Sequence, residues 1–329
     1  MTYPHLIGGL AALVAILFTA SLLIGPAALG FWESMAALFA GEGEAAVLVM
    51  REIRLPRAIL GLMIGATLGL CGAALQGYLR NPLAEPGLIG ISSSAALGAV
   101  IAIYTGLSAA FPLALPVLAL AGAGMAVLVI LVLAGGHGGS ITLILAGIAI
   151  SSLAGALTSL ALNLSPNPFA ALEIMFWLLG SLADRSMTHV WLAAPFMLLG
   201  WAMIAGLGRG LDALTLGEDA AASLGIRLGR LRLAVVLGTA SAVGAATAVA
   251  GTIGFVGLVV PHLLRPLVGA QPSRLLLASA LGGAAMLLAG DLAVRLIAPG
   301  QDLKLGVLTA LVGAPFFLWL VIAKRRELS

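Results

Sequence analysis

Residues that commonly carry out chemistry are few in this sequence and lie far apart. Its only lysines are Lys304 and Lys324, and neither ends a glycine-rich stretch of the Gly-Lys-Ser/Thr type, so a Walker A loop for nucleotide phosphates is excluded. The four histidines have no cysteine or carboxylate at ligand spacing, and we predict no metal site. The single cysteine, Cys71, lies in an apolar run. We therefore expect neither a catalytic site nor a resident cofactor, and the chain is not expected to be an enzyme.

The composition is that of a membrane protein. Hydrophobic residues make up 61% of the 329 residues and charged residues only 9%, which leaves too little polar surface for a water-soluble domain of this size. The apolar runs are continuous rather than alternating, so we predict an all-α polytopic membrane protein rather than a barrel. The 43 glycines indicate close helix packing through small residues. The net charge of +3 is typical of basic cytoplasmic loops and does not indicate a nucleic-acid partner.

About ten transmembrane helices are predicted, all within a single transmembrane domain over residues 1–329. The predicted spans are 6–29, 58–79, 91–107, 112–134, 141–163, 190–207, 233–252, 255–269, 275–297 and 305–323. We interpret the first as a retained span, since it is longer than a signal-peptide core. The eighth is short and contains Pro261, so a re-entrant segment is the alternative there, and it would place the two termini on opposite sides. Between spans five and six, we expect a helix lying in the membrane interface with Trp177 as its anchor.

The charge distribution predicts the orientation of the chain. With both termini in the cytoplasm, ten of the 16 Lys and Arg residues fall inside, and eight of the 13 Asp and Glu residues fall outside. This agrees with the positive-inside rule. Three of the outer cations, Arg54, Arg57 and Arg295, run against that bias. Asp291 and Arg295 are four residues apart near the outer end of a span, so they can pair on one helix face.

The stretch Arg209–Arg232 is the most highly charged part of the chain and lies between two spans. We expect a short helix over residues 215–225 within it. Thr215 and Glu218 have the spacing of a capping box, and Glu218 and Asp219 suit the positive end of the helix dipole. Gly225 can end the helix in the left-handed conformation. Two interpretations remain open for this helix: a solvated loop, or a docking element for a soluble partner.

An irregular turn is predicted after the second span. The dipeptides Asn81-Pro82 and Glu85-Pro86 interrupt the helix there. Irregular backbone at a membrane edge persists only where it packs within protein or lines a cavity. Residues 81–94 are therefore a candidate pore-mouth element, with an ordinary turn as the alternative.

Three sequence blocks resemble the FecCD-type permeases of ABC importers. The first comprises RLPR at 54–57 followed by GAALQGYLRNPLAEPGLIGISSSA at 72–95. The others are GTIGFVGLVVPHLLRPLVG at 251–269 and LGVLTALVGAPFFLWL at 305–320, and all three stand in the order found in the family. The resemblance implies a type II ABC importer permease fold, a homodimer, two cytoplasmic ATPase subunits that hold ATP and Mg, and a periplasmic substrate-binding protein. It also implies import of a ferric siderophore, haem or cobalamin across the bacterial inner membrane.

The resemblance also implies roles for individual residues of this chain. Arg54, Arg57 and Arg295 match cations that meet carboxylates of the binding protein, whereas local pairing with Glu52 or Asp291 is the alternative. The coupling helix that contacts the ATPase would comprise Thr215, Leu216, Gly217, Glu218, Asp219, Ala220, Ala221, Ser223, Leu224 and Gly225. The cytoplasmic gate would comprise Asn81, Pro82, Leu83, Ser140 and Thr142.

The sequence therefore predicts a permease that works by alternating access, driven by ATP hydrolysis in partner subunits. An ATP-independent secondary transporter or channel is the alternative. No acidic residue falls in the middle of a predicted span, which counts against an ion-coupled transporter.

Overall fold

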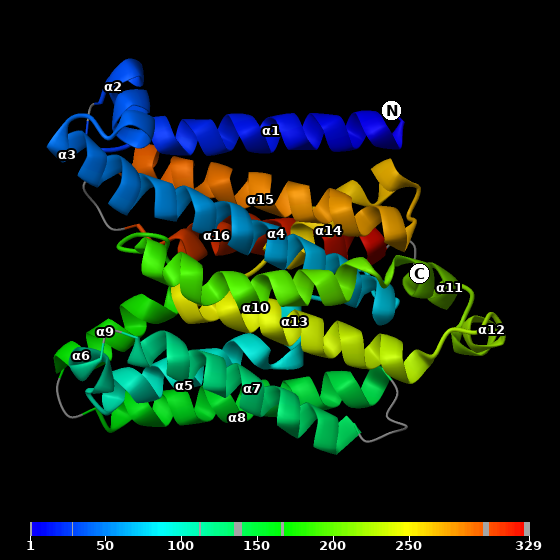
Figure 1. Ribbon diagram of the computed structural model, residues 1–329. Coiled ribbons are helices and arrows are strands. Elements are labelled where there is room, and N and C mark those ends of the chain that lie inside the picture. The colour runs from blue at the N-terminus through cyan, green and yellow to red at the C-terminus, as the bar shows by residue number, and fades with distance from the viewer. Residues whose placement is uncertain are drawn as a thin grey trace.

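The computed structural model describes residues 2–27, 29–111, 113–134, 140–165, 168–298 and 303–325. A helix lies within each of the ten predicted spans or overlaps it, and the ten helices form one bundle (Figure 1). They are α1 (Tyr3–Leu23), α4 (Leu55–Tyr78), α5 (Ile91–Tyr104), α7 (Ala114–Ala134), α8 (Ser140–Asn163), α10 (Met187–Ala205), α13 (Leu228–Ala250), α14 (Val256–Leu264), α15 (Pro272–Ile297) and α16 (Leu305–Arg325). The all-α prediction is confirmed.

Short helices connect the long ones at the two ends of the bundle. They are α2 (Phe31–Met35), α3 (Glu44–Val47), α6 (Leu107–Ala110), α9 (Pro168–Leu178), α11 (Gly208–Leu214) and α12 (Glu218–Ser223), the π-helical segments η1 (Ala36–Ala40) and η2 (Leu48–Arg54), and the 3-10 segments η3 (Pro86–Ile89) and η4 (Pro266–Val268). Figure 1 shows α2, α3, α6 and α9 together at one end, which we call the α2 end. The helices α11 and α12 extend beyond the opposite end, the α12 end, where both chain ends also lie.

Two of the ten helices are too short to cross a bilayer alone. Within the described ranges, seven helices have the length and apolar character of a full membrane span. Of the other three, α16 has a shorter apolar stretch over Leu305–Leu320, α5 has only 14 residues and α14 has only 9. At 1.5 Å per residue α5 and α14 are about 21 Å and about 14 Å long, against a hydrocarbon core of about 30 Å. Irregular segments must therefore complete both crossings.

The eighth predicted span differs from the expectation of a helix over 255–269. Residues 251–254 form no helix, and α14 ends at Leu264. Gly251 packs against the carbonyl oxygen of Trp177, near the α2 end. Arg265 instead donates from Nη2 to Gln76 Oε1 at 2.7 Å, near the α12 end of α4. The segment crosses the bundle as extended chain followed by a short helix, so both termini lie at the same end.

Small residues bring the central helices into close contact, as predicted. A methyl group on Gly69 of α4 would overlap the carbonyl oxygen of Ser279 on α15, and one on Gly65 would overlap that of Gly283. Backbones can approach this closely only where side chains are minimal. The α4–α15 pair therefore forms the centre of the bundle, and most of α4 is buried.

The interface helix between spans five and six forms, but its predicted anchor is wrong. Helix α9 covers residues 168–178, and Trp177 is only 8% exposed and packs in the main core. The exposed aromatic side chains on this helix are those of Phe169 and Phe176. Trp177 therefore packs inside the protein instead of anchoring the helix at a lipid surface.

Candidate functional site

The α12 end carries the predicted coupling segment as a short helix that protrudes from the bundle. Helix α12 begins at Glu218, and its N-cap residue is Gly217, with φ 104°. The predicted capping box is therefore wrong. Thr215 instead ends α11, and its hydroxyl donates to the carbonyl oxygen of Asp212 at 2.6 Å. Gly225 has φ 84°, in agreement with the predicted left-handed end.

The surface of this protrusion combines acidic and apolar side chains. Glu218 and Asp219 lie in the first turn of α12 and are exposed. Their negative charges stabilise the helix there, because its N-terminus is the positive end of the helix dipole. Leu216 and Leu224, at either end of α12, are 69% and 65% exposed. Exposed leucines beside charges, outside the membrane-spanning part of the bundle, are typical of a protein contact.

Asp212 connects this protrusion to the central helix α15, a role for which the sequence contained no local signal. Its Oδ1 accepts a hydrogen bond from the Ser273 backbone N–H at 2.8 Å, and its Oδ2 accepts one from Gln271 Nε2 at 3.1 Å. Ser273 lies in the first turn of α15, whose backbone N–H groups have no partners within the helix. The Asp212 carboxylate therefore fixes α11 to the start of α15.

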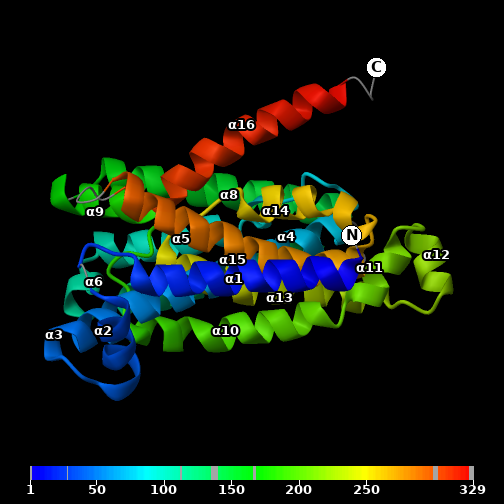
Figure 2. The ribbon, with the colours of Figure 1, turned by 90° about the horizontal axis from the view of Figure 1, so that it is seen from above.

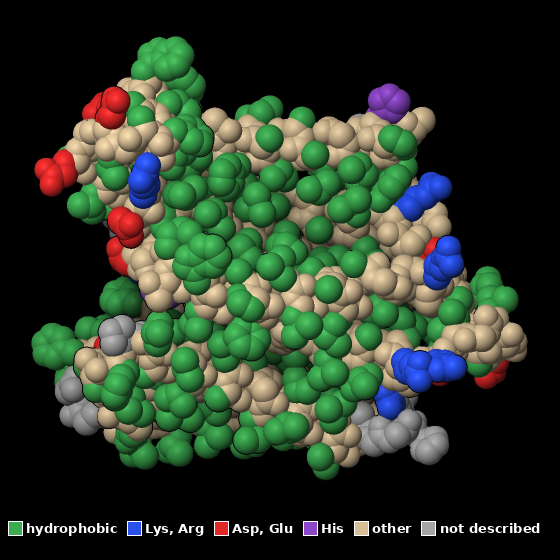
Figure 3. All heavy atoms as spheres, viewed as in Figure 1, with side chains coloured by type: hydrophobic (Ala, Val, Ile, Leu, Met, Phe, Trp, Pro, Cys, Tyr) green, Lys and Arg blue, Asp and Glu red, His purple; other side chains and the backbone are tan. Residues whose placement is uncertain are grey.

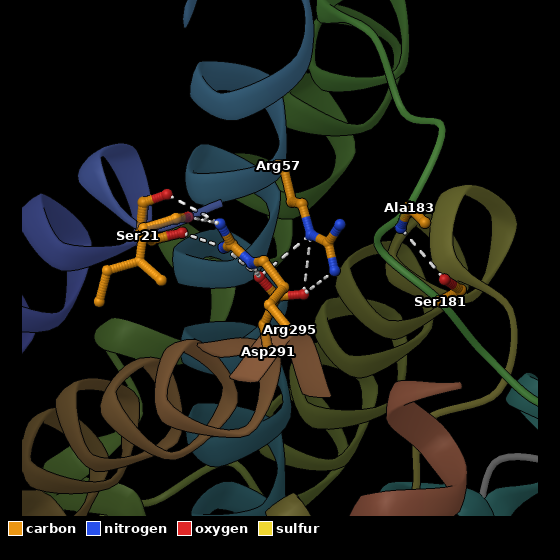
Figure 4. Close-up of polar contacts among 7 residues, drawn as sticks. Ser21, Arg57, Ser181, Ala183, Asp291 and Arg295 are labelled. Carbon is orange, nitrogen blue, oxygen red and sulfur yellow. Dashed lines mark hydrogen bonds and ion pairs between the residues drawn. The ribbon is translucent and has the colours of Figure 1, made fainter. Parts of the chain in front are cut away.

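The α2 end contains a largely buried cluster of charges from α4 and α15, which also binds polar groups of α1 (Figure 4). Arg57 of α4 binds Asp291 of α15 through Nη2 at 2.8 Å and Nε at 2.9 Å. Arg295 binds the same carboxylate through Nε at 3.0 Å and also donates from Nη1 to the Ser21 carbonyl oxygen of α1 at 2.9 Å. Asp291 is 1% exposed. The predicted Asp291–Arg295 pair is confirmed, and Asp291 is also the local partner of Arg57.

Arg54 does not lie on the outer surface, contrary to the expectation for an outer cation. It is 3% exposed, and its Nη1 donates to the carbonyl oxygens of Leu22 at 3.0 Å and Leu23 at 2.9 Å, while Nη2 donates to Ala27. These carbonyls belong to the last turn of α1 and the residues after it, where the helix leaves its acceptors unpaired. The buried guanidinium of Arg54 thus ends α1 and leaves little surface for direct contact with another protein.

The turn after α4 folds back into the bundle. Asn81 Oδ1 accepts from the Leu83 N–H at 2.9 Å, which forms a local turn. Five residues after Asn81, Pro86 packs on Gly257 of α14, which also packs against Leu68 of α4. Leu68 lies ten residues before the end of α4, or about 15 Å along its axis. The irregular backbone therefore packs within protein, which is one of the two settings in which such backbone persists at a membrane edge.

The two predicted gate segments approach each other through a neighbouring contact. Residue Gly147 of α8 lies against the Leu88 carbonyl oxygen of η3. Thr142 is half-buried near the start of α8, whereas the Ser140 side chain lies outside the described part of the structure. Asn81 is exposed, and Pro82 and Leu83 are half-buried. The contact therefore joins the turn to α8, downstream of the residues named from sequence.

An apolar cavity of about 580 Å³ lies beside α16. Its walls are formed by the end of α9, the segment 252–255 and the first half of α16. Figure 2 shows α16 diverging from the bundle toward the C-terminus. Within the described residues, no group of three His, Cys, Asp or Glu side chains is placed to hold a metal ion.

Comparison with known proteins places this architecture in a transport family. The model of the FecCD transport family matches residues 13–323. The cobalamin import system permease protein BtuC of Halobacterium salinarum is 39% identical over 283 residues, covering 85% of this chain and 75% of the relative. The hemin transport system permease protein HmuU of Yersinia pestis is 36% identical over 339 residues, covering 98% and 97%.

A solved structure shares the fold over nearly its full length. It is an inward-facing conformation of a metal-chelate type ABC transporter, with a TM-score of 0.86 and 33% identity, covering 97% of this chain and 99% of that one. The predicted type II permease fold is thus confirmed at the level of the whole chain. With the family match extending over nearly all its residues, this multi-pass membrane protein belongs to the FecCD transport family of ABC transporter permeases.

Proposed function

We propose that the chain is the membrane-spanning subunit of an ATP-driven importer in the bacterial inner membrane. It passes a metal chelate, such as a ferric siderophore, haem or cobalamin, from a periplasmic binding protein to the cytoplasm by alternating access. The α11–α12 protrusion is the observation that carries this proposal, because it presents exposed side chains beyond the bundle and is fixed to α15 through Asp212. A channel working alone has no need of such an element.

The proposed partner at the α12 end is a cytoplasmic ATPase. The chain has no Walker A loop, so ATP and Mg belong to that partner. Exposed Leu216 and Leu224 would enter an apolar cleft of the ATPase, and Glu218 and Asp219 would meet basic side chains at its rim. The remaining residues of the coupling segment, from Thr215 to Gly225, would shape the backbone between these contacts.

A second copy of the chain is proposed to complete the pathway. Helix α16 exposes Leu311, Leu318 and Trp319, and α8 exposes Ile141 and Leu145. These faces would meet across the dimer axis, with lipid covering the rest of the bundle. The turn at Asn81, Pro82 and Leu83 and the start of α8 at Ser140 and Thr142 would then face their counterparts at the cytoplasmic gate.

The binding protein is proposed to dock at the α2 end. The Arg57 side chain is 19% exposed, and we propose that it meets a carboxylate of the docked protein. Arg54 and Arg295 contribute indirectly, because they hold α1, α4 and α15 together beneath the docking surface. The surface would serve orientation and encounter rate more than affinity.

Reconstitution of the full chain with its co-expressed ATPase tests the proposal. Proteoliposomes with the cognate binding protein should take up radiolabelled cobalamin, haem or a ferric siderophore. Uptake should occur only when ATP is present on the side of the membrane that carries the ATPase. A variant carrying Glu218→Lys and Asp219→Lys should lose both ATPase copurification and uptake. Uptake that continues without ATPase and ATP would support the secondary transporter or channel instead.

A further inference from the structure

Glu85 joins the irregular turn after α4 to the start of α14. Its Oε1 accepts a hydrogen bond from the Phe255 backbone N–H at 2.6 Å, between residues 170 apart in the sequence. The carboxylate also lies at the N-terminal end of α14, where the helix dipole favours negative charge. Pro86, the next residue, packs on Gly257, where an added Cβ would lie 2.7 Å from Pro86 Cδ. The turn is therefore fixed to α14 through a polar contact and a packing contact.

The residue that Glu85 binds has an uncommon backbone conformation. Phe255 has φ 68°, in the left-handed region that non-glycine residues rarely adopt. Such a conformation persists only when surrounding structure holds it in place. The hydrogen bond that the Phe255 N–H donates to the Glu85 carboxylate supplies a specific reason for this conformation to persist here.

The left-handed conformation has a consequence for α16. It directs the Phe255 ring against Gly313, where an added methyl group would overlap the ring atoms. Phe255 also lines the cavity of about 580 Å³ beside α16, together with Gly306, Ala310 and Ala314. The contact between Phe255 and Gly313 is therefore one of the points that hold α16 to the bundle, from which the helix departs toward the C-terminus (Figure 2).

We propose that Glu85 is a positioning residue that holds Phe255 against Gly313 and so seats α16. Through this linkage, movement of the irregular turn after α4 is transmitted to α16 and changes the width of the cavity beside α16. The importance of the linkage for import rests on the proposed function above. The linkage itself is a property of the isolated permease and is tested without ATP or substrate.

The backbone half of the linkage is tested by amide hydrogen exchange of the full chain in nanodiscs. Glu85→Ala removes the acceptor, and exchange at the Phe255 N–H should accelerate about tenfold or more, as expected for loss of a charge-assisted hydrogen bond. Glu85→Gln keeps an acceptor oxygen in the same place and should exchange at an intermediate rate. Equal exchange in the parent and both variants would overturn the assignment.

The α16 half is tested by maleimide labelling of an Ala310→Cys reporter on the cavity wall, in a Cys71→Ala background. Glu85→Ala should change the labelling rate, whereas Glu85→Gln should restore most of the parent rate. Phe255→Gly removes the ring and the need for support, because glycine adopts positive φ freely. Glu85→Ala should therefore have no further effect in a Phe255→Gly background. An undiminished effect in that background would mean that Glu85 acts elsewhere, and would overturn the proposal.

A folding failure of Glu85→Ala alone is also informative. If that variant is not monodisperse, the double variant Glu85→Ala with Phe255→Gly should be, since the strained residue is gone. A double variant that also fails to fold would contradict the proposed linkage. ATPase copurification of the same variants reports on the proposed function separately, because α12 lies outside this linkage.

Discussion

At the scale of single residues, the unusual feature of this chain is buried charge. Asp291 lies between the guanidiniums of Arg57 and Arg295, and Arg54 binds the carbonyl oxygens at the end of α1. Buried charges are tolerated only when their partners are complete. Removing one member of the cluster leaves the others desolvated and unpaired, so each residue is expected to matter more for stability than an exposed ion pair would.

Asp291→Asn should be strongly destabilising. The substitution preserves the shape of the side chain but leaves the buried guanidinium of Arg295 and the partly buried one of Arg57 without a counter-charge, at an expected loss of about 3–5 kcal/mol in unfolding free energy. Thermal unfolding of the purified permease, followed by size-exclusion chromatography, measures the loss. Glu52→Gln at an exposed position of the same end is the matched control. Equal melting temperatures for the two variants would show that the cluster is dispensable.

Arg54→Ala is expected to affect stability without a specific effect on docking. It removes hydrogen bonds from a charged donor to carbonyl oxygens after α1, at an expected loss of about 2 kcal/mol. The binding-protein affinity of the fraction that remains folded should be close to that of the parent, because Arg54 is buried. The paired measurements are thermal stability and binding-protein affinity in nanodiscs. A variant that stays stable but binds the binding protein much more weakly would mean that Arg54 contacts that protein directly.

At the scale of elements, α15 connects the two ends of the molecule. Its first turn is held by Asp212 of α11, and its last turns carry Asp291 and Arg295. Between them it packs on α4 through glycines that permit backbone contact. A continuous helix of 26 residues fixed at both ends is suited to transmit displacement from the α12 end to the α2 end.

Asp212→Ala should uncouple ATP hydrolysis from import. The ATPase should still copurify, because α12 keeps its exposed surface, but import per ATP should fall about tenfold as the charge-assisted bond to Ser273 is lost. Asp212→Asn keeps an acceptor for the Ser273 N–H and should recover much of the import. Glu42→Ala, in an exposed loop of the α2 end, is the control carboxylate. Parallel loss of ATPase binding and import would point to general damage at the α12 end.

A second prediction concerns the close contact between α4 and α15. Gly69→Ala should cost about 1–3 kcal/mol because its methyl group overlaps the Ser279 backbone and forces the helices apart. Gly8→Ala in α1 meets nothing within 4 Å and should be neutral or slightly stabilising. Thermal unfolding of both variants measures the difference. A neutral Gly69→Ala would mean that the two helices separate without loss.

At the scale of the whole molecule, charge is divided between the two ends of an apolar body. Figure 3 shows hydrophobic side chains over the middle of the visible face, mostly Asp and Glu among the charged side chains at the α2 end, and mostly Lys and Arg among those at the α12 end. This distribution agrees with the predicted orientation, in which the α12 end is cytoplasmic.

Labelling in intact cells tests that orientation. In a Cys71→Ala background, Glu42→Cys at the α2 end should react with a membrane-impermeant maleimide added to spheroplasts. Thr215→Cys at the α12 end should react only after the membrane is permeabilised, because the positive-inside rule places that end in the cytoplasm. Both positions are exposed in the chain itself, and expression without the ATPase subunit keeps Thr215 uncovered in the comparison. The reverse pattern would invert the assigned topology.

Part of this architecture was predictable because its cause is local in the sequence. The length of each apolar run predicted the ten helices, and glycine content predicted close packing such as that at Gly69. Gly225 was identified as the left-handed residue after the coupling helix, since few other residues adopt that conformation. The prediction that Thr215 caps the coupling helix was wrong, because the spacing between Thr215 and Glu218 does not decide whether Thr215 ends one helix or begins the next.

The sequence by itself determined the membrane class, the helix count and the family, because hydropathy and short motifs are properties of neighbouring residues. Only the tertiary structure decided which polar groups meet. Asp212 and Ser273 are 61 residues apart, Glu85 and Phe255 are 170 apart, and Arg57 and Asp291 are 234 apart. In an apolar interior each buried polar group must find a partner, but many groups could serve, and helix packing selects among them. As a result, Arg54 and Arg295, which were expected at the outer surface, bind partners inside the protein. The turn after α4 likewise contacts α14 through Glu85.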